Sequence, residues 1–216
     1  MQGIMIKELY ECCCIKKNLI SLIVNLVFLL AIIIALKNLY GCILVIGITL
    51  PMMGISVFQS AIEQDEISKY DQILLTFPIT VSQIIKAKMM TTFLFTVVIN
   101  VVVSLPVTLL YVLGYQAVSL KMGILIFVLG FIAALIFNAV TTIGFLWLGN
   151  SKGAIMYIIM VSLIAIGYII FNFNFDIKTI LTSNTSLIII VMMLVALILT
   201  VISYFISIKI YQSKHS

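Results

Sequence analysis

The residues best suited to chemistry are four acids, Glu63, Asp65, Glu66 and Asp71, which fall within nine positions. The chain has only seven acidic residues, so this acidic run holds most of its carboxylates. Clustered carboxylates can bind a metal ion or act as a general acid and base. A zinc site would normally add histidine ligands, but the single histidine, His215, lies far away in the sequence. We therefore expect a polar surface here, with no metal and no catalytic role.

Cysteine is the second reactive residue type, and three of the four cysteines, Cys12, Cys13 and Cys14, are consecutive. The fourth, Cys42, stands alone. Consecutive cysteines lack the spacing of metal ligands or of a disulfide framework. The pattern favours small apolar side chains on a helix, with reduced thiols.

The sequence lacks the motif that binds ATP through a phosphate-binding loop. The pattern G-x-x-x-x-G-K-[ST] does not occur, because the nearest stretch, GNSKG at 149–153, has the wrong spacing. The metalloprotease pattern H-E-x-x-H is also missing. We expect a chain that is not an enzyme and that holds no cofactor of its own.

The composition is that of a membrane protein. Of 216 residues, 64% are hydrophobic and 9% are charged, and the mean hydropathy is +1.33. A soluble domain has about a quarter of its residues charged. The net charge of +5 comes without a stripe of basic and aromatic residues, so we expect no nucleic-acid partner.

Six apolar segments are long enough to cross a bilayer, which takes about 20 helical residues. None contains a charged residue, which argues against an ion-coupled carrier or a channel. We predict an all-α polytopic membrane protein, one membrane domain over residues 1–216, with six transmembrane helices. The predicted crossings are residues 19–36, 41–62, 91–113, 122–148, 153–171 and 187–208.

The lysines predict the orientation of these crossings. If the N-terminus is inside the cell, nine lysines fall in cytoplasmic segments and three, Lys37, Lys121 and Lys178, in outer loops. Cytoplasmic loops are enriched in Lys and Arg, so this arrangement is favoured over its reverse. Both termini and the connection 63–90 are therefore expected in the cytoplasm.

The first eighteen residues precede the first crossing and have an amphipathic pattern. Lys7, Glu8 and Glu11 share one face of a helical wheel. The pattern predicts a helix over residues 1–18 that lies in the membrane interface. The opposite, apolar face is expected to hold Met5, Ile6, Leu9, Tyr10, Cys12 and Cys13.

The connection 63–90 is the only long polar segment between crossings. Tyr70, Ile73, Leu74 and Phe77 are spaced i, i+3, i+4 and i+7, which predicts one exposed helical face. We expect Ser68 to cap this helix and Pro78 to end it and to open a second helix. In that second helix, Lys86 and Lys88 are expected to extend to the membrane surface. The segment is either a solvated connector or a docking element for another protein.

Neutral polar residues and prolines interrupt the crossings. Pro51 and Pro106 predict kinks in the second and third crossings. The amides either join helices by hydrogen bonds or line a path for a substrate, and methionines suit both a core and such a path. The amides are Asn25, Gln59, Asn100 and Asn138.

The connection also carries a longer pattern of acids, an apolar helix, a Phe-Pro-Ile-Thr turn and a lysine at the next crossing. In this pattern the chain resembles the membrane subunits of type-2 ABC exporters, and more narrowly the small six-crossing bacterial permeases of phenol-soluble modulins and antimicrobial peptides. That group often has Leu in place of Phe77, and Arg or Lys in place of Val81. The matching residues are Glu63, Asp65, Asp71, Leu74, Phe77, Pro78, Ile79, Thr80, Ile84 and Lys88.

This resemblance implies a function that the residues alone do not. The chain would be the permease of an ATP-driven exporter in a bacterial cytoplasmic membrane, moving amphipathic or antimicrobial peptides or other hydrophobic molecules. It would pair with a second permease chain, expected to be a homodimer, and with two copies of a separate ATPase that holds ATP and Mg. Residues 68–77 would form a coupling helix. The implied coupling residues are Glu63, Asp65, Glu66, Tyr70, Asp71, Ile73, Leu74, Phe77 and Pro78.

The resemblance also implies a path at the dimer axis, lined by crossings two and five. Met53 and Ser56 of crossing two, with Met156 and Met160 of crossing five, are the candidate lining residues. An alternative function of another class is a membrane scaffold or accessory subunit that transports nothing.

The predicted orientation can be tested by cysteine labelling. In a chain whose four native cysteines are changed to alanine, a cysteine in place of Lys121 should react with an impermeant maleimide in intact cells, because Lys121 is expected outside. Labelling that appears only after the membrane is permeabilised would contradict the orientation.

Overall fold

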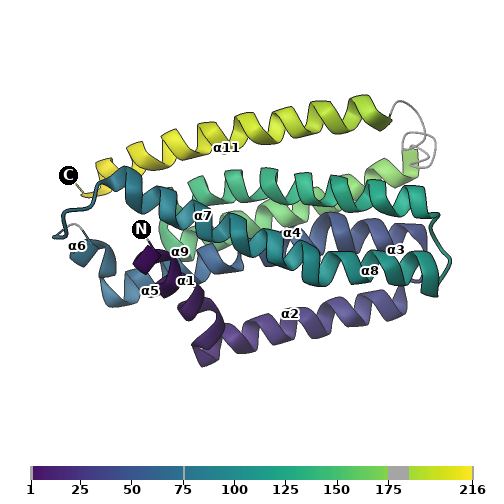
Figure 1. The fold of residues 1–216 in the computed structure, drawn as a ribbon, viewed down its shortest axis with the longest axis horizontal. Helices are drawn as coiled ribbons and strands as arrows, with labels where there is room; N and C mark the ends of the chain where they lie inside the picture. Colours follow the sequence, from purple (N-terminus) through teal and green to yellow (C-terminus); the bar gives the residue numbers. More distant parts are fainter. Residues whose placement is uncertain (1, 75, 175–184, 216) are drawn as a thin grey trace.

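The computed structural model describes residues 2–74, 76–174 and 185–215, and all regular structure in these ranges is helical. The helices run side by side as a long bundle (Figure 1). The outer-loop lysine Lys178 lies outside the described residues. In chain order the helices are α1 Gln2–Cys14, α2 Lys16–Ala35, α3 Leu39–Leu44, η1 Val45–Thr49, α4 Leu50–Gly54, α5 Ser56–Ser68, α6 Tyr70–Leu74, α7 Val81–Ile99, η2 Asn100–Ser104, α8 Leu105–Leu109, η3 Leu110–Gly114, α9 Leu120–Asn174 and α11 Thr185–His215.

Within the described ranges, five continuous helices are long and apolar enough to cross a membrane. An all-helical, multi-pass membrane architecture is therefore confirmed. The count differs from the six predicted crossings because residues 122–148 and 153–171 both fall within α9. The five spans are Lys16–Ala35, Leu39–Ser68, Val81–Gly114, Leu120–Gly167 and Leu187–Lys214.

The long helix α9 reverses direction at Gly149 (Figure 1). Gly149 has φ 78° and ψ 179°, a conformation that residues with a side chain rarely adopt. The two arms then pack against each other, with the ring centroids of Phe137 and Tyr157 5.6 Å apart. Gly144 permits the close approach, because a Cβ there would meet the Met156 side chain.

Prolines break the second and third long helices, as their positions predict. Pro51 lies in α4 directly after the π-helical turn η1, and Pro106 lies in α8 directly after the π-helical turn η2. Proline lacks an N–H and crowds the carbonyl of the preceding turn, so the helix widens there instead of keeping its regular hydrogen bonds.

Polar groups join neighbouring helices inside the bundle. The side-chain amide of Asn138 on α9 donates to Thr96 Oγ1 on α7 at 2.7 Å, and Ser203 Oγ on α11 donates to the Ala139 carbonyl at 2.7 Å. Asn100 instead donates to the Thr96 carbonyl of its own helical segment. Of the amides that could join helices by hydrogen bonds, Asn138 therefore does so and Asn100 does not.

The predicted boundaries within the connection 63–90 are wrong. Helix α5 continues to Ser68, whose hydroxyl donates back to the Gln64 carbonyl at 2.6 Å, so Ser68 does not cap a following helix. Lys69, with φ 51°, ends α5, and α6 is a single short turn. Pro78 does not open the next helix, because α7 begins at Val81 behind a capping box in which Thr80 and Gln83 bond each other's backbone.

Candidate functional site

One end of the bundle gathers most of the chain's charge. We call it the α6 end; it comprises α1, the end of α5, α6, the start of α7, the bend of α9 and the end of α11 (Figure 1). The acidic run lies here, so the structure brings together the segment that the sequence singles out and the two terminal helices.

A buried lysine lies at the centre of this end. Lys88 on α7 is only 1% exposed, and its ammonium is ion-paired with Asp65 of α5, itself 2% exposed. Two further carboxylates lie 3.9 Å from Lys88 Nζ, Glu8 Oε1 of α1 and Asp71 Oδ1 of α6. Because a lysine is almost never buried unless it is paired, these acids are what allow Lys88 to stay inside.

A second lysine, Lys7 of α1, extends the network. It is ion-paired with Asp65 and lies 3.1 Å from Glu11, and its ammonium lies 3.9 Å from the centroid of the Tyr70 ring. The Tyr211 hydroxyl of α11 donates to Asp71 at 2.8 Å. We call the six charged residues Lys7, Glu8, Glu11, Asp65, Asp71 and Lys88 the charged hub.

The charged hub has more carboxylates than ammonium groups, and burial changes how its acids titrate. Desolvation raises the pKa of Glu8 to about 7, although the nearby Lys88 ammonium opposes this. Burial likewise raises the pKa of Glu11, against the effect of Lys7. The acids face lysines, and within the described residues no group of acids, cysteines and histidine is arranged to hold a metal ion. In the described residues, the hub is thus a network of ion pairs between acids and lysines.

The remaining acids of the run have separate partners. Glu63 is ion-paired with Lys17 at the start of α2. Glu66 Oε1 accepts the backbone N–H of Asn150 at 2.8 Å and so fixes the bend of α9. Each acid of the run therefore contacts another part of the chain. A polar surface was expected here from the sequence, and these contacts were not predicted.

The apolar stripe of the connection is split between core and surface. Ile73 is 48% exposed and Phe77 is 51% exposed, and Pro78 is exposed beside them. Leu74 is 1% exposed, so its predicted exposure is wrong; its core cluster includes Phe58, Ile62 and Ile84. Tyr70 is half-buried under Lys7. The short α6 turn places Leu74 inward, while Ile73 and Phe77 stay outside.

Two other predictions about exposure are also wrong. Lys88 does not extend to the membrane surface, because the acids around it hold it inside, whereas Lys86 is exposed as predicted. In α1 the buried face is Ile4, Glu8 and Cys12, so Glu8 points inward although it belongs to the predicted polar face. The pairing of Glu8 with a lysine 80 positions away is the reason.

The candidate path residues have different surroundings. Met53 is buried in a core cluster, Met160 borders an apolar cavity, and Met156 packs into the bend of α9. Of the four, Ser56 borders a polar cavity of about 490 Å³ between α2, α5 and the second arm of α9.

Single residues that border this polar cavity were named from the sequence, but the polar helical face that lines it was not predicted. Ser56, Gln59, Ser60 and Glu63 are spaced i, i+3, i+4 and i+7, a polar helical face that the sequence would have revealed. Asn25 of α2 faces the same cavity, and in the described chain the amides of Asn25 and Gln59 make no hydrogen bond. Such free amides can bind the polar part of a ligand.

A second pattern was also missed. The stretch 149–153, GNSKG, matches G-x-S-x-G, the nucleophile turn of many hydrolases. That turn joins a strand to a helix, whereas here helix lies on both sides of the bend. The match therefore does not indicate a hydrolase.

Comparisons with known proteins agree with a transport architecture. The family model described as "ABC-2 family transporter protein" matches residues 3–212, nearly the whole chain. Searches among curated proteins and among solved structures find no significant match.

Removal of the central lysine should destabilise the α6 end. In Lys88→Met, Asp65 and Glu8 stay buried with less compensating charge, and breaking a buried ion pair in this way costs about 3–5 kcal/mol. We expect a clearly lower thermal unfolding temperature in detergent. The control Lys209→Met removes an exposed lysine of α11 and should unfold like the unchanged chain. Equal unfolding of both variants would contradict the role of the hub.

Stability should also depend on pH through Glu8. Because its pKa rises from 4.5 to about 7 on folding, the folded chain binds the proton more tightly, so this group's contribution to stability falls between about pH 4.5 and 7. Glu8→Gln removes that contribution. The unfolding temperature of Glu8→Gln, measured relative to that of the unchanged chain, should therefore increase as the pH rises through this range. Parallel pH profiles would show that Glu8 does not titrate as described.

Proposed function

The chain belongs to the ABC-2 transporter family, and from this premise we propose that it is the permease subunit of an ATP-driven exporter, coupled through α6 to a separate ATPase subunit. The carrying observation is the exposure of Ile73 in α6 and of Phe77 shortly after it, beside the anchored Leu74. Apolar side chains at the end of a bundle, outside the apolar spans, favour contact with another protein.

The anchoring of α6 supports a coupling role. Leu74 fixes the turn in the core, while Asp71 joins it to Lys88 and to Tyr211. A force applied to α6 by a partner would therefore reach α7 and α11 directly, and α5 through Asp65. The expectation that Asp65 contacts an ATPase is not retained in this proposal, because Asp65 is buried inside the chain.

We propose that the α6 end is cytoplasmic, with both termini there, and that each arm of α9 crosses the membrane. The 48 residues Leu120–Gly167 would extend about 72 Å as a straight helix, more than twice the apolar thickness of a bilayer. The reversal at Gly149 accommodates this length as two crossings, for a total of six. The lysines at the α6 end fit the cytoplasmic side.

The proposed complex pairs this chain with a second permease copy and with two ATPase subunits that supply ATP and Mg. The outer faces of α2 and α11 are apolar and largely exposed, which suits contact with lipid or with another copy. We propose amphipathic peptides or other hydrophobic molecules as the substrate. The polar cavity around Gln59 would take the polar part of such a molecule.

A scaffold or accessory subunit without transport remains the second candidate. The exposed segment with Ile73 and Phe77, which we call the docking turn, and the charged hub would serve a scaffold equally well. The two functions differ in one measurable property. A permease should alter ATP hydrolysis by its partner when substrate is added to the reconstituted complex, whereas a scaffold should leave hydrolysis unchanged.

The docking turn can be tested with the two exposed residues. In the double variant Ile73→Asp and Phe77→Asp, binding of the proposed ABC ATPase partner should weaken by about 30-fold or more, the effect of losing one interface hot spot of about 2 kcal/mol. The measurement is co-purification together with ATPase activity. Leu74→Asp is unsuitable because Leu74 is buried.

A matched control is Gln212→Asp, which places a new carboxylate on an exposed residue of α11 at the same end of the bundle. It should leave ATPase binding unchanged. If the double variant still binds the ATPase and keeps its activity coupled, α6 is not the contact. If the unchanged chain binds no such ATPase, the scaffold is favoured.

A further inference from the structure

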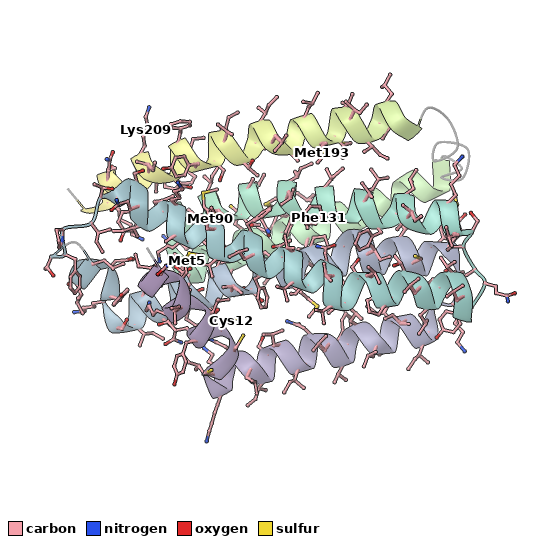
Figure 2. All side chains as sticks on the ribbon, in the orientation of Figure 1. Met5, Cys12, Met90, Phe131, Met193 and Lys209 are labelled. Atoms are coloured by element: carbon pink, nitrogen blue, oxygen red, sulfur yellow. The ribbon has the colours of Figure 1, made fainter. Side chains whose placement is uncertain are left out.

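A narrow apolar slot lies between three helices on the side of the bundle away from α2. It has a volume of about 240 Å³ and runs between α7, the first arm of α9 and α11. Figure 2 shows Met90 of α7 in this region, with α11 lying alongside. The slot walls include Met90, Phe93, Ala139 and Leu197.

The polar residues of the slot present little polarity to a ligand. The hydroxyls of Thr92, Thr142 and Thr200 donate to backbone carbonyls of their own helices at 3.0, 2.7 and 2.8 Å. The amide nitrogen of Asn138 donates to Thr96, and its unpaired Oδ1 is covered by protein atoms. A ligand would therefore meet methyl, methylene and aromatic groups, which suits a hydrocarbon chain.

The mouth of the slot is different, because it carries a cation and two hydroxyls. Lys86 lines the slot and is exposed, and in the described chain it makes no ion pair, in contrast to Lys88 two residues later. Tyr204 also lines the slot, and its hydroxyl forms a hydrogen bond of 2.7 Å with the Ser82 hydroxyl. An ammonium and hydroxyl donors together suit a phosphate group.

The slot also has the direction that a lipid needs. From Lys86 to Phe93 the helix α7 advances about 10 Å along its axis, from the α6 end toward the middle of the bundle. Phe93, Met90 and Leu197 are exposed along this line, so the slot opens sideways toward the membrane. A cationic mouth beside an apolar groove is complementary to an anionic lipid, whose charged headgroup adjoins its acyl chains.

We propose that this slot binds an anionic phospholipid, with its phosphate at Lys86 and Tyr204 and one acyl chain between α7 and α11. The bound lipid would fill the space between α7 and α11 and hold the two helices together. This site does not depend on the proposed coupling to an ATPase. An amphipathic peptide is the rival occupant.

The test is lipid binding to the full-length chain in detergent, with dioleoyl phosphatidylglycerol and dioleoyl phosphatidylcholine compared by native mass spectrometry. We expect one tightly held phosphatidylglycerol and weaker binding of phosphatidylcholine. Lys86→Gln, an exposed change, should weaken phosphatidylglycerol binding by about five-fold, because one basic residue near an anionic lipid contributes about 1 kcal/mol. Leu197→Trp should fill the groove and reduce binding of both lipids.

Two matched variants serve as controls. Lys209→Gln removes a lysine that lies on the outer side of α11 and does not line the slot (Figure 2). Ile202→Trp enlarges an exposed α11 residue outside the slot. Both should bind phosphatidylglycerol like the unchanged chain.

Three results would overturn the proposal. The first is equal affinity for the two lipids, and the second is unchanged binding by Lys86→Gln and Leu197→Trp. The third is a competition result in which an amphipathic cationic peptide displaces the bound lipid at a lower concentration than added phosphatidylglycerol does. That result would assign the slot to a peptide. None of these three measurements depends on ATPase coupling. The lipid-site proposal is therefore tested independently of the proposed function.

Discussion

The buried ion pair between Lys88 and Asp65 is the interaction on which the α6 end depends. An ammonium that is 1% exposed requires carboxylates around it, and they come from three other helices, α1, α5 and α6. Tyr211 adds α11 through its hydrogen bond to Asp71. Because a buried charge without compensation is costly, moving one of the carboxylate-bearing helices away while Lys88 stays buried would destabilise this end. The docking turn, the terminal helices and two long spans are thereby held in one arrangement.

The middle of the bundle follows a different rule. Its cohesion comes from apolar packing and a few neutral hydrogen bonds, such as Asn138 to Thr96 and Ser203 to Ala139. Two long helices are broken there by Pro51 and Pro106 and widen into π-helical turns. The ion pairs hold the α6 end together, whereas the helices are irregular at the two prolines. Bending at the prolines can therefore leave the α6 end intact.

Sequence patterns predicted the local features of this fold and missed those that depend on distant residues. Hydrophobic length predicted the spans, and Pro51 and Pro106 predicted their breaks, because both signals lie within one helix. The burial of Glu8 and Lys88 was missed, since they are 80 positions apart and each looks like an exposed charge. The inward side chain of Leu74 was missed because α6 is a single turn, so its periodicity cannot define one exposed face. The acidic run was expected as a polar surface, and its partners Lys17, Asn150 and Tyr211 were missed because they come from elements far along the chain.

Helix α5 connects the two halves of the proposed mechanism. One of its faces carries Phe58, Ile62 and Asp65, spaced i, i+4 and i+7, and meets the core and the charged hub. The opposite face carries Ser56, Gln59, Ser60 and Glu63, which line the polar cavity. A rotation or shift of α5 imposed at Asp65 must therefore move the cavity wall as well, because both faces belong to one rigid helix of 13 residues. In an exporter driven from α6, as proposed above, this shared helix would connect an ATPase at one end with a substrate in the membrane.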